Sequence, residues 1–216
     1  MKYDDTVDFK VNCNSAEYFK LFEPYIPKLK LGSTVLLYAI SNVDCLKNII
    51  DKNQDCVYYI YDTTAIFDVL KLINENNNVI LVNDISEANM KFDCIIMNPP
   101  YKKNLHLKIL EKAITKLKDE NSVCVNLSPV RWLQDPLAKY KKNCDLKRFN
   151  ESVVKHIESL NVIEALTAQK LFNGAGSATD LGVYKCRNSN YNSISLILPF
   201  IQRIIDWQKG STVHFD

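Results

Sequence analysis

Glycine and proline are scarce in this sequence, with 5 glycines and 7 prolines among 216 residues. This scarcity excludes collagen-like and low-complexity chains, and a hydrophobic content of 47% excludes intrinsic disorder. No apolar run approaches the roughly 20 residues that cross a bilayer. The charged start, Met1–Asp5, also lacks the apolar stretch of a signal peptide. We therefore expect neither a membrane-spanning nor a secreted protein.

Disulfide and metal-ligand patterns are missing as well. The 7 cysteines are odd in number and never occur as Cys-x-x-Cys, and the 3 histidines are isolated from one another. Several cysteines lie within apolar runs, where cysteine acts as a small hydrophobic residue. The sequence therefore predicts a reducing, cytoplasmic environment without a disulfide framework and without a metal site.

Short apolar runs alternate with amphipathic stretches from residue 33 onward. Seven runs predict strands, at 33–40, 56–61, 79–82, 92–97, 122–127, 162–166 and 181–186. Helices are expected at 63–74, 105–118 and 149–160, and another runs to about residue 52 from a capping box of Ser41 and Asp44. Near-continuous apolar strands separated by helices predict a doubly wound α/β fold, with a mostly parallel seven-stranded sheet and helices on both faces.

The chain is long enough for one full core, and a second independent domain is not expected. We divide it into an N-terminal lead-in (1–30), an α/β domain (31–187) and a short C-terminal helical extension (188–216). The extension contains a predicted helix at 199–207, with proline near its start.

One motif follows the fourth predicted strand directly: Asn98, Pro99, Pro100 and Tyr101. In open parallel sheets, ligands bind beyond the carboxyl ends of the strands. Two prolines fix φ and remove two backbone donors, so the turn is stiff and presents carbonyl oxygens. The Asn98 side-chain oxygen and the Pro99 carbonyl can accept hydrogen bonds from one NH2 group, and they favour the positive charge that builds on its nitrogen during attack on an electrophile. Tyr101 offers a ring on which a base can stack, and the structural alternative is a rigid turn with a buried tyrosine.

Residues 92–101, Phe-Asp-Cys-Ile-Ile-Met-Asn-Pro-Pro-Tyr, closely resemble motif IV of S-adenosylmethionine-dependent amino-methyltransferases. The similarity is greatest to DNA adenine-N6 methyltransferases of type II restriction–modification systems, and weaker similarity continues at 127–133 and 171–185. The resemblance implies a Rossmann-like methyltransferase fold with an antiparallel last strand. It implies methyl transfer from S-adenosylmethionine to N6 of adenine in DNA, with Asn98 and the Pro99 carbonyl holding the amino group.

The resemblance also implies a cofactor site. Asp62 would bind the ribose hydroxyls and Asp84 would approach the adenine of the cofactor, although a helix cap and an Asx turn explain these two acids equally well. The family uses a glycine-rich loop after its first strand, because glycine adopts φ > 0 freely and lets the backbone approach the cofactor. The matching segment here, 38–44, has no glycine, so Ala39 and Ser41 would contact the cofactor in an unusual loop. A degenerate methyltransferase-fold subunit, which binds nucleic acid or protein but no cofactor, is the alternative.

Basic and aromatic residues follow the motif. The candidate nucleic-acid contacts are Lys102, Lys103, Arg131, Trp132, Lys141 and Lys142. Such residues track phosphates and stack on bases, whereas the plainer explanation is a solvated helix face. The motif is also similar to that of methyltransferases acting on the glutamine-N5 amide of release factors, but the segment 128–132 and the basic stretch after it favour DNA, with RNA left open. Because only about 30 residues follow the domain, sequence specificity would be slight or would come from a protein partner or a further segment.

Overall fold

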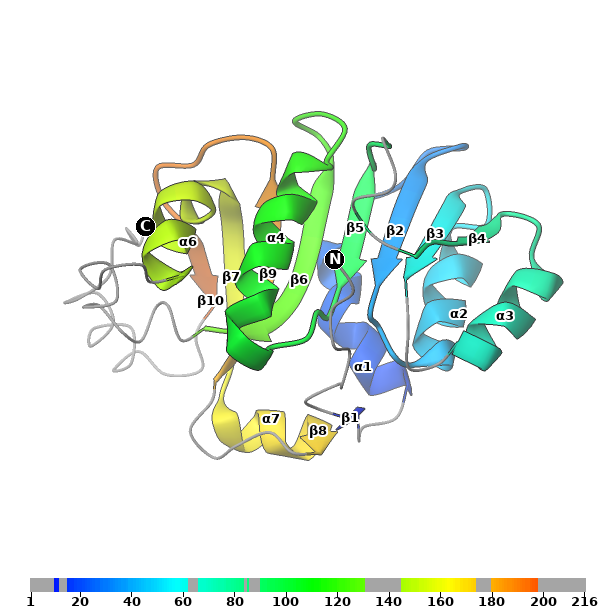
Figure 1. Cartoon of the computed structure of the whole chain (residues 1–216), viewed down its shortest axis with the longest axis horizontal. Coiled ribbons are helices and arrows are strands. Elements are labelled where there is room, and N and C mark those ends of the chain that lie inside the picture. Colours follow the sequence, from blue (N-terminus) through cyan, green and yellow to red (C-terminus); the bar gives the residue numbers. More distant parts are fainter. Residues whose placement is uncertain are drawn as a thin grey trace.

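The computed structural model describes residues 10–11, 15–61, 66–83, 85, 90–130, 145–173 and 180–197. They form a large sheet with helices on both faces and a small sheet of two strands (Figure 1). The strands of the large sheet are β2 (Thr34–Tyr38), β3 (Val57–Tyr61), β4 (Val79–Leu81), β5 (Cys94–Met97), β6 (Val123–Pro129), β7 (Ile157–Ile163), β9 (Leu181–Arg187) and β10 (Ser195–Ile197). The small sheet pairs β1 (Lys10–Val11) with β8 (Phe172–Asn173) in antiparallel fashion.

The helices divide between the two faces of the large sheet (Figure 1). One face is covered by α1 (Ser15–Phe22), α2 (Val43–Lys52) and α3 (Ile66–Glu75), and the other by α4 (Leu105–Thr115) and α6 (Asp145–Ser152). In the described part of the chain, the remaining helical elements are α7 (Ala165–Leu171) and the 3-10 turns η1 (Glu23–Tyr25), η2 (Lys102–Asn104) and η4 (Val154–His156).

The strand order in the large sheet is β10-β7-β9-β6-β5-β2-β3-β4. All neighbouring strands are parallel except β9, which is antiparallel to both β6 and β7. The predicted doubly wound, mostly parallel sheet with a late antiparallel strand is therefore confirmed. The sheet has an eighth strand, β10, that is not among the seven predicted strands. It lies in the range 188–216, where a helical extension is expected, and it pairs with β7. The helix predicted at 199–207 lies outside the described residues.

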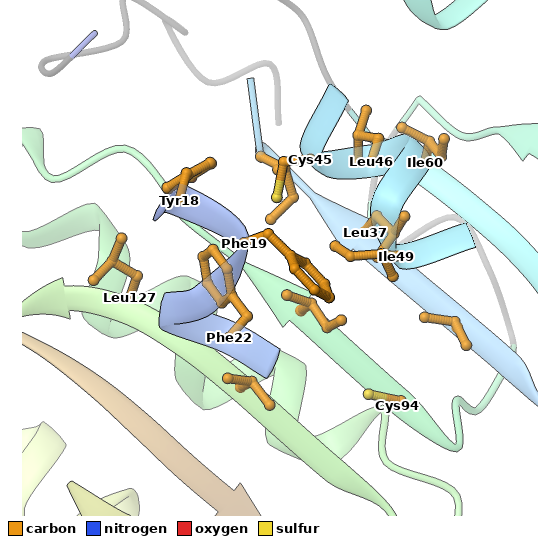
Figure 2. Packing of buried hydrophobic residues seen from close by; sticks show 14 of the residues in the cluster. Tyr18, Phe19, Phe22, Leu37, Cys45, Leu46, Ile49, Ile60, Cys94 and Leu127 are labelled. Carbon is orange, nitrogen blue, oxygen red and sulfur yellow. The ribbon is translucent and has the colours of Figure 1, made fainter. Parts of the chain in front are cut away.

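The helix α1 belongs to the range 1–30 and packs against the large sheet. Its side chains Tyr18, Phe19 and Phe22 enter a buried cluster with Leu37 of β2 and Leu127 of β6 (Figure 2). Tyr18 and Phe22 are completely buried. Burial of one large apolar side chain contributes roughly 1.5–3 kcal/mol, so α1 is an integral layer of the fold.

The helix predicted at 149–160 is wrong in its second half. The chain leaves α6 at Ser152, and η4 leads into β7 at Ile157. A register shift between Ile157 and Ser159 changes the alternation of the strand, so Ile157 and Leu160 face the same core. A bulge inserts one extra residue into a strand, so two residues three positions apart can lie on the same face. In the sequence, this spacing of apolar residues is the same as that of a helix. The strand predicted at 162–166 is corrected accordingly, and Ala165 begins α7 instead.

The cysteines of the described residues are free and buried: Cys45, Cys56, Cys94, Cys124 and Cys186. Burial raises the pKa of the Cys94 thiol to about 12. These side chains therefore act as small hydrophobic residues, as the sequence predicted.

Candidate functional site

The candidate site lies where the order of the strands reverses. From β2 the chain builds outward through β3 and β4, and it then returns to β5 on the other side of β2. Ligands of doubly wound sheets bind beyond the carboxyl ends of the strands at such a switch point. The Asn98 amide N–H donates to the Tyr38 carbonyl oxygen at 3.0 Å, so the first residue after β5 is held against the last residue of β2.

The side chain of Asn98 has partners on both sides. Its Nδ2 donates to the hydroxyl oxygen of Tyr18 at 2.9 Å, and its Oδ1 accepts a hydrogen bond from the hydroxyl of Tyr101 at 2.6 Å. The Tyr101 hydroxyl also lies 3.2 Å from the Leu127 carbonyl oxygen of β6. Pro99 is buried, and Asn98 and Tyr101 are half-buried. The turn is therefore stiff, and its side chains connect α1, β5 and β6.

His106 is a site residue that no sequence pattern indicates. Its ring meets the Tyr101 ring edge-on, with centroids 5.6 Å apart and an interplanar angle of 79°. It is 4% exposed, and its Nδ1 has no hydrogen-bond partner among the residues that the structure describes. Desolvation lowers the pKa of His106 to about 4, against a smaller opposing effect of a hydrogen bond with the Tyr101 backbone. His106 is thus a neutral imidazole at pH 7, and an isolated histidine in an amphipathic helix gave no signal of this contact.

The loop after β2 adopts a glycine-like backbone without glycine. Ala39 has φ 53° and Ser41 has φ 55°, both in the left-handed region. The Ala39 N–H donates to the Tyr61 carbonyl oxygen at 2.7 Å, which fixes the loop on β3. The predicted capping box is wrong, because the residue that caps α2 is Asn42, whose side chain accepts a hydrogen bond from the Cys45 N–H at 2.8 Å. Ser41 precedes the cap and has positive φ instead.

Two further tyrosines meet at the carboxyl ends of β2 and β3. The rings of Tyr38 and Tyr61 stack with centroids 4.5 Å apart and an interplanar angle of 9°. Both side chains belong to the core on the α4 face of the sheet. Neither was predicted as a site residue, since each completes an apolar strand in the sequence.

Backbone strain in the described residues is concentrated in two loops of this site. Non-glycine residues with positive φ are Ala39 and Ser41 after β2, and Lys103 and Asn104 after β5. Such conformations cost of order 1 kcal/mol or more each, and they persist only where the surrounding structure enforces them. The two loops that flank the switch point are therefore held in unfavourable backbone conformations.

The predicted nucleic-acid contacts fall partly within the described residues. Lys102 and Lys103 are exposed in η2, directly after the motif. The other predicted site residues lie outside the described residues: Asp62, Asp84, Arg131, Trp132, Lys141 and Lys142. Within the described part of the chain, no group of three or more metal-ligating side chains is present, and no helix is long and apolar enough to cross a membrane.

This strand order, with the antiparallel β9 beside β6, is the Rossmann-like methyltransferase fold. Among solved structures, the chain is similar to a dimethyladenosine transferase from Plasmodium falciparum, with a TM-score of 0.55 and 16% identity, over 82% of this chain and 63% of that one. It is also similar to the 23S rRNA methyltransferase ErmE, with a TM-score of 0.53 and 13% identity, over 82% of this chain and 70% of that one. The chain thus spans less than two thirds of the Plasmodium enzyme. No protein-family model and no curated protein sequence matches it.

Proposed function

We propose that this protein is an S-adenosylmethionine-dependent methyltransferase that methylates N6 of adenine in a nucleic acid, with DNA as the substrate that the sequence favours. The observation that carries the proposal is the position of Asn98-Pro99-Pro100-Tyr101 at the switch point of a methyltransferase fold. The exposed Lys102 and Lys103 beside the motif suit a phosphate backbone.

The backbone conformation of the loop after β2 is compatible with cofactor binding. In the family, glycine lets the backbone of this loop approach the cofactor, because it has no Cβ and adopts the left-handed conformation freely. Ala39 and Ser41 adopt that conformation without glycine. We infer that the cofactor is bound against this loop at the N-terminus of α2, where Asn42 caps the helix.

In the proposed reaction, bound S-adenosylmethionine supplies an electrophilic methyl group. Transfer of this methyl group to the amino nitrogen would break the carbon–sulfur bond, leave its electron pair on sulfur and release one N–H proton to water. Asn98 Oδ1 and the Pro99 carbonyl oxygen accept hydrogen bonds from the two N–H groups of the target amine. These two oxygens also stabilise the positive charge that develops on nitrogen. Tyr101 first releases Oδ1, so that an N–H···O bond from the substrate replaces the present O–H···O bond of 2.6 Å.

The direct test is methyl transfer by the purified full chain to adenine-containing DNA, with RNA and a glutamine-containing peptide in parallel. Products are identified by mass spectrometry of nucleosides and peptide. We expect N6-methyladenine from DNA, and a loss of at least about 100-fold in rate for Asn98→Ala. Asn121→Ala is the matched control, since Asn121 is exposed on the loop before β6, and it keeps full activity. If methyladenine formed only in RNA, the substrate would be RNA and not DNA. If only methylglutamine formed, the substrate would be a protein.

A cofactor-free interaction module is the second candidate, and one observation favours it. Asn98 Oδ1, the proposed acceptor for the target amino group, already accepts a hydrogen bond from the Tyr101 hydroxyl within the protein. A thermal melt with S-adenosylmethionine separates the two candidates. Cofactor at 100 times its Kd adds about 2.7 kcal/mol, or roughly 5–10 °C in Tm for a chain of this size. No shift at millimolar cofactor, together with nucleic-acid binding that is indifferent to Asn98→Ala, would overturn the enzyme and support the module.

A further inference from the structure

The aromatic ring of Tyr18 is held rigidly beneath the motif. Tyr18 is completely buried on α1. Its ring meets Phe22 edge-on at 5.3 Å between centroids, and Phe172 of β8 edge-on at 6.0 Å. Figure 2 shows Tyr18 and Phe22 on α1, with Leu127 of β6 close to the helix. These aromatic neighbours therefore hold the Tyr18 ring in place, with its hydroxyl next to the site.

The hydroxyl oxygen of Tyr18 accepts a hydrogen bond from Asn98 Nδ2 at 2.9 Å, although the two residues are 80 positions apart in the chain. A side-chain amide has one donor side and one acceptor side. With Nδ2 bound to Tyr18, the acceptor Oδ1 is presented on the opposite side, where the Tyr101 hydroxyl donates to it. The reversed amide would present an NH2 group to the incoming amino group, and two donors repel.

We propose that Tyr18 is a positioning residue for the amino-methyl transfer, because it fixes the Asn98 amide with its oxygen toward the target amino group. This inference rests on the proposed function. Tyr18 acts through Asn98 and does not touch the reacting atoms. An aspartate in place of Asn98 would make the contribution of Tyr18 dispensable, since a carboxylate presents an oxygen on both sides.

A double-mutant cycle tests the proposal. We expect Tyr18→Phe, which keeps the ring and its contacts, to lower kcat about 10- to 100-fold while KM changes less than threefold. In the Asn98→Asp background, the same substitution should lower kcat less than threefold. An equal loss in both backgrounds would show a merely structural role for Tyr18, and no loss in the Asn98 background would show no role.

A matched control removes a buried hydroxyl elsewhere. Tyr58 is completely buried in β3, and its hydroxyl donates to the Asn53 carbonyl oxygen at 2.9 Å, away from Asn98. Tyr58→Phe should lower Tm about as much as Tyr18→Phe and leave kcat unchanged. A fall in kcat for both variants would indicate that stability, and not amide orientation, controls the rate.

A second readout does not depend on activity. The side-chain NH2 resonances of Asn98 are assigned in the 15N NMR spectrum by their absence in Asn98→Asp. We expect hydrogen exchange of this NH2 group to be at least tenfold faster in Tyr18→Phe than in the wild type. If the wild type transfers no methyl group but the exchange rates differ as stated, the proposed function fails while the contact stands. Equal exchange rates would overturn the role of Tyr18 itself.

Discussion

Glycine at position 39 or 41 should stabilise this protein, in contrast to its usual effect. Ala39 and Ser41 have φ near +54°, where a side chain costs roughly 1–2 kcal/mol. Replacement by glycine relieves this cost but raises the entropy of the unfolded chain, at about 0.4–1 kcal/mol. Ala39 also packs partly against the core, so loss of its methyl group removes about 0.4 kcal/mol. We expect a net stabilisation of about 0.4 kcal/mol for Ala39→Gly, within a range of about −0.4 to 1.2 kcal/mol, and of about 0.8 kcal/mol for Ser41→Gly, within a range of about 0 to 1.6 kcal/mol.

The assay is urea unfolding with linear extrapolation of the free energy to water. The matched control is Ala16→Gly, at an exposed position of α1 where the backbone is helical. Glycine costs about 1 kcal/mol relative to alanine in a helix interior, so this control, in the first turn of α1, should be destabilised by up to that amount. Ala39→Val should lose more than 1 kcal/mol, because a β-branched side chain is least compatible with positive φ.

The opposite signs of Ala39→Gly and Ala16→Gly make the reasoning refutable. If both substitutions destabilise the protein by about the same amount, the loop after β2 does not carry the strain that its dihedral angles indicate. If the glycine variants are more stable and still bind S-adenosylmethionine at least as tightly as the wild type, the loop conformation is the one that the cofactor requires.

Two predictions concern buried residues near the site. His106 has its pKa lowered to about 4 from 6.5, so the folded state binds fewer protons than the unfolded state between these values, and stability should fall by up to about 3 kcal/mol as pH drops from 6.5 to 4. In His106→Phe, the free energy of unfolding measured in urea should fall less steeply as the pH drops across this range. An unchanged pH dependence would contradict the lowered pKa of His106. Gly182→Ala places a Cβ 2.6 Å from the buried side chains of Leu160 and Val130, so a loss of about 1–3 kcal/mol is expected, whereas a neutral result in the same assay would contradict this crowding.

Most of the sheet could be predicted from the sequence, because parallel strands buried on both faces are continuous apolar runs. β2, β3, β5, β6 and β9 begin and end within two residues of their predictions. β7 was misplaced because its bulge puts Ile157 and Leu160 on one face at helical spacing. β10 was not predicted, because it has three residues and its run of apolar residues is too short to indicate a strand.

The site divides in the same way between sequence and tertiary structure. The motif at residues 98–101 was found by local spacing alone, since the turn follows its strand directly. The partners of the motif were not predictable, because Tyr18 lies 80 residues from Asn98 and is an ordinary core residue in its own helix. Likewise, Asn42 replaced Ser41 as the cap of α2 once the loop had turned through positive φ.

The sequence by itself determined the α/β class, the mostly parallel sheet and the position of the motif, because hydrophobic periodicity and a rigid proline turn are local properties. Only the tertiary structure decided which side chains meet at the switch point. Strand order, helix packing and the left-handed bends at Ala39 and Ser41 depend on contacts between distant segments. These contacts bring Tyr18, Asn98 and Tyr101 into one hydrogen-bonded chain, and no local pattern encodes that juxtaposition.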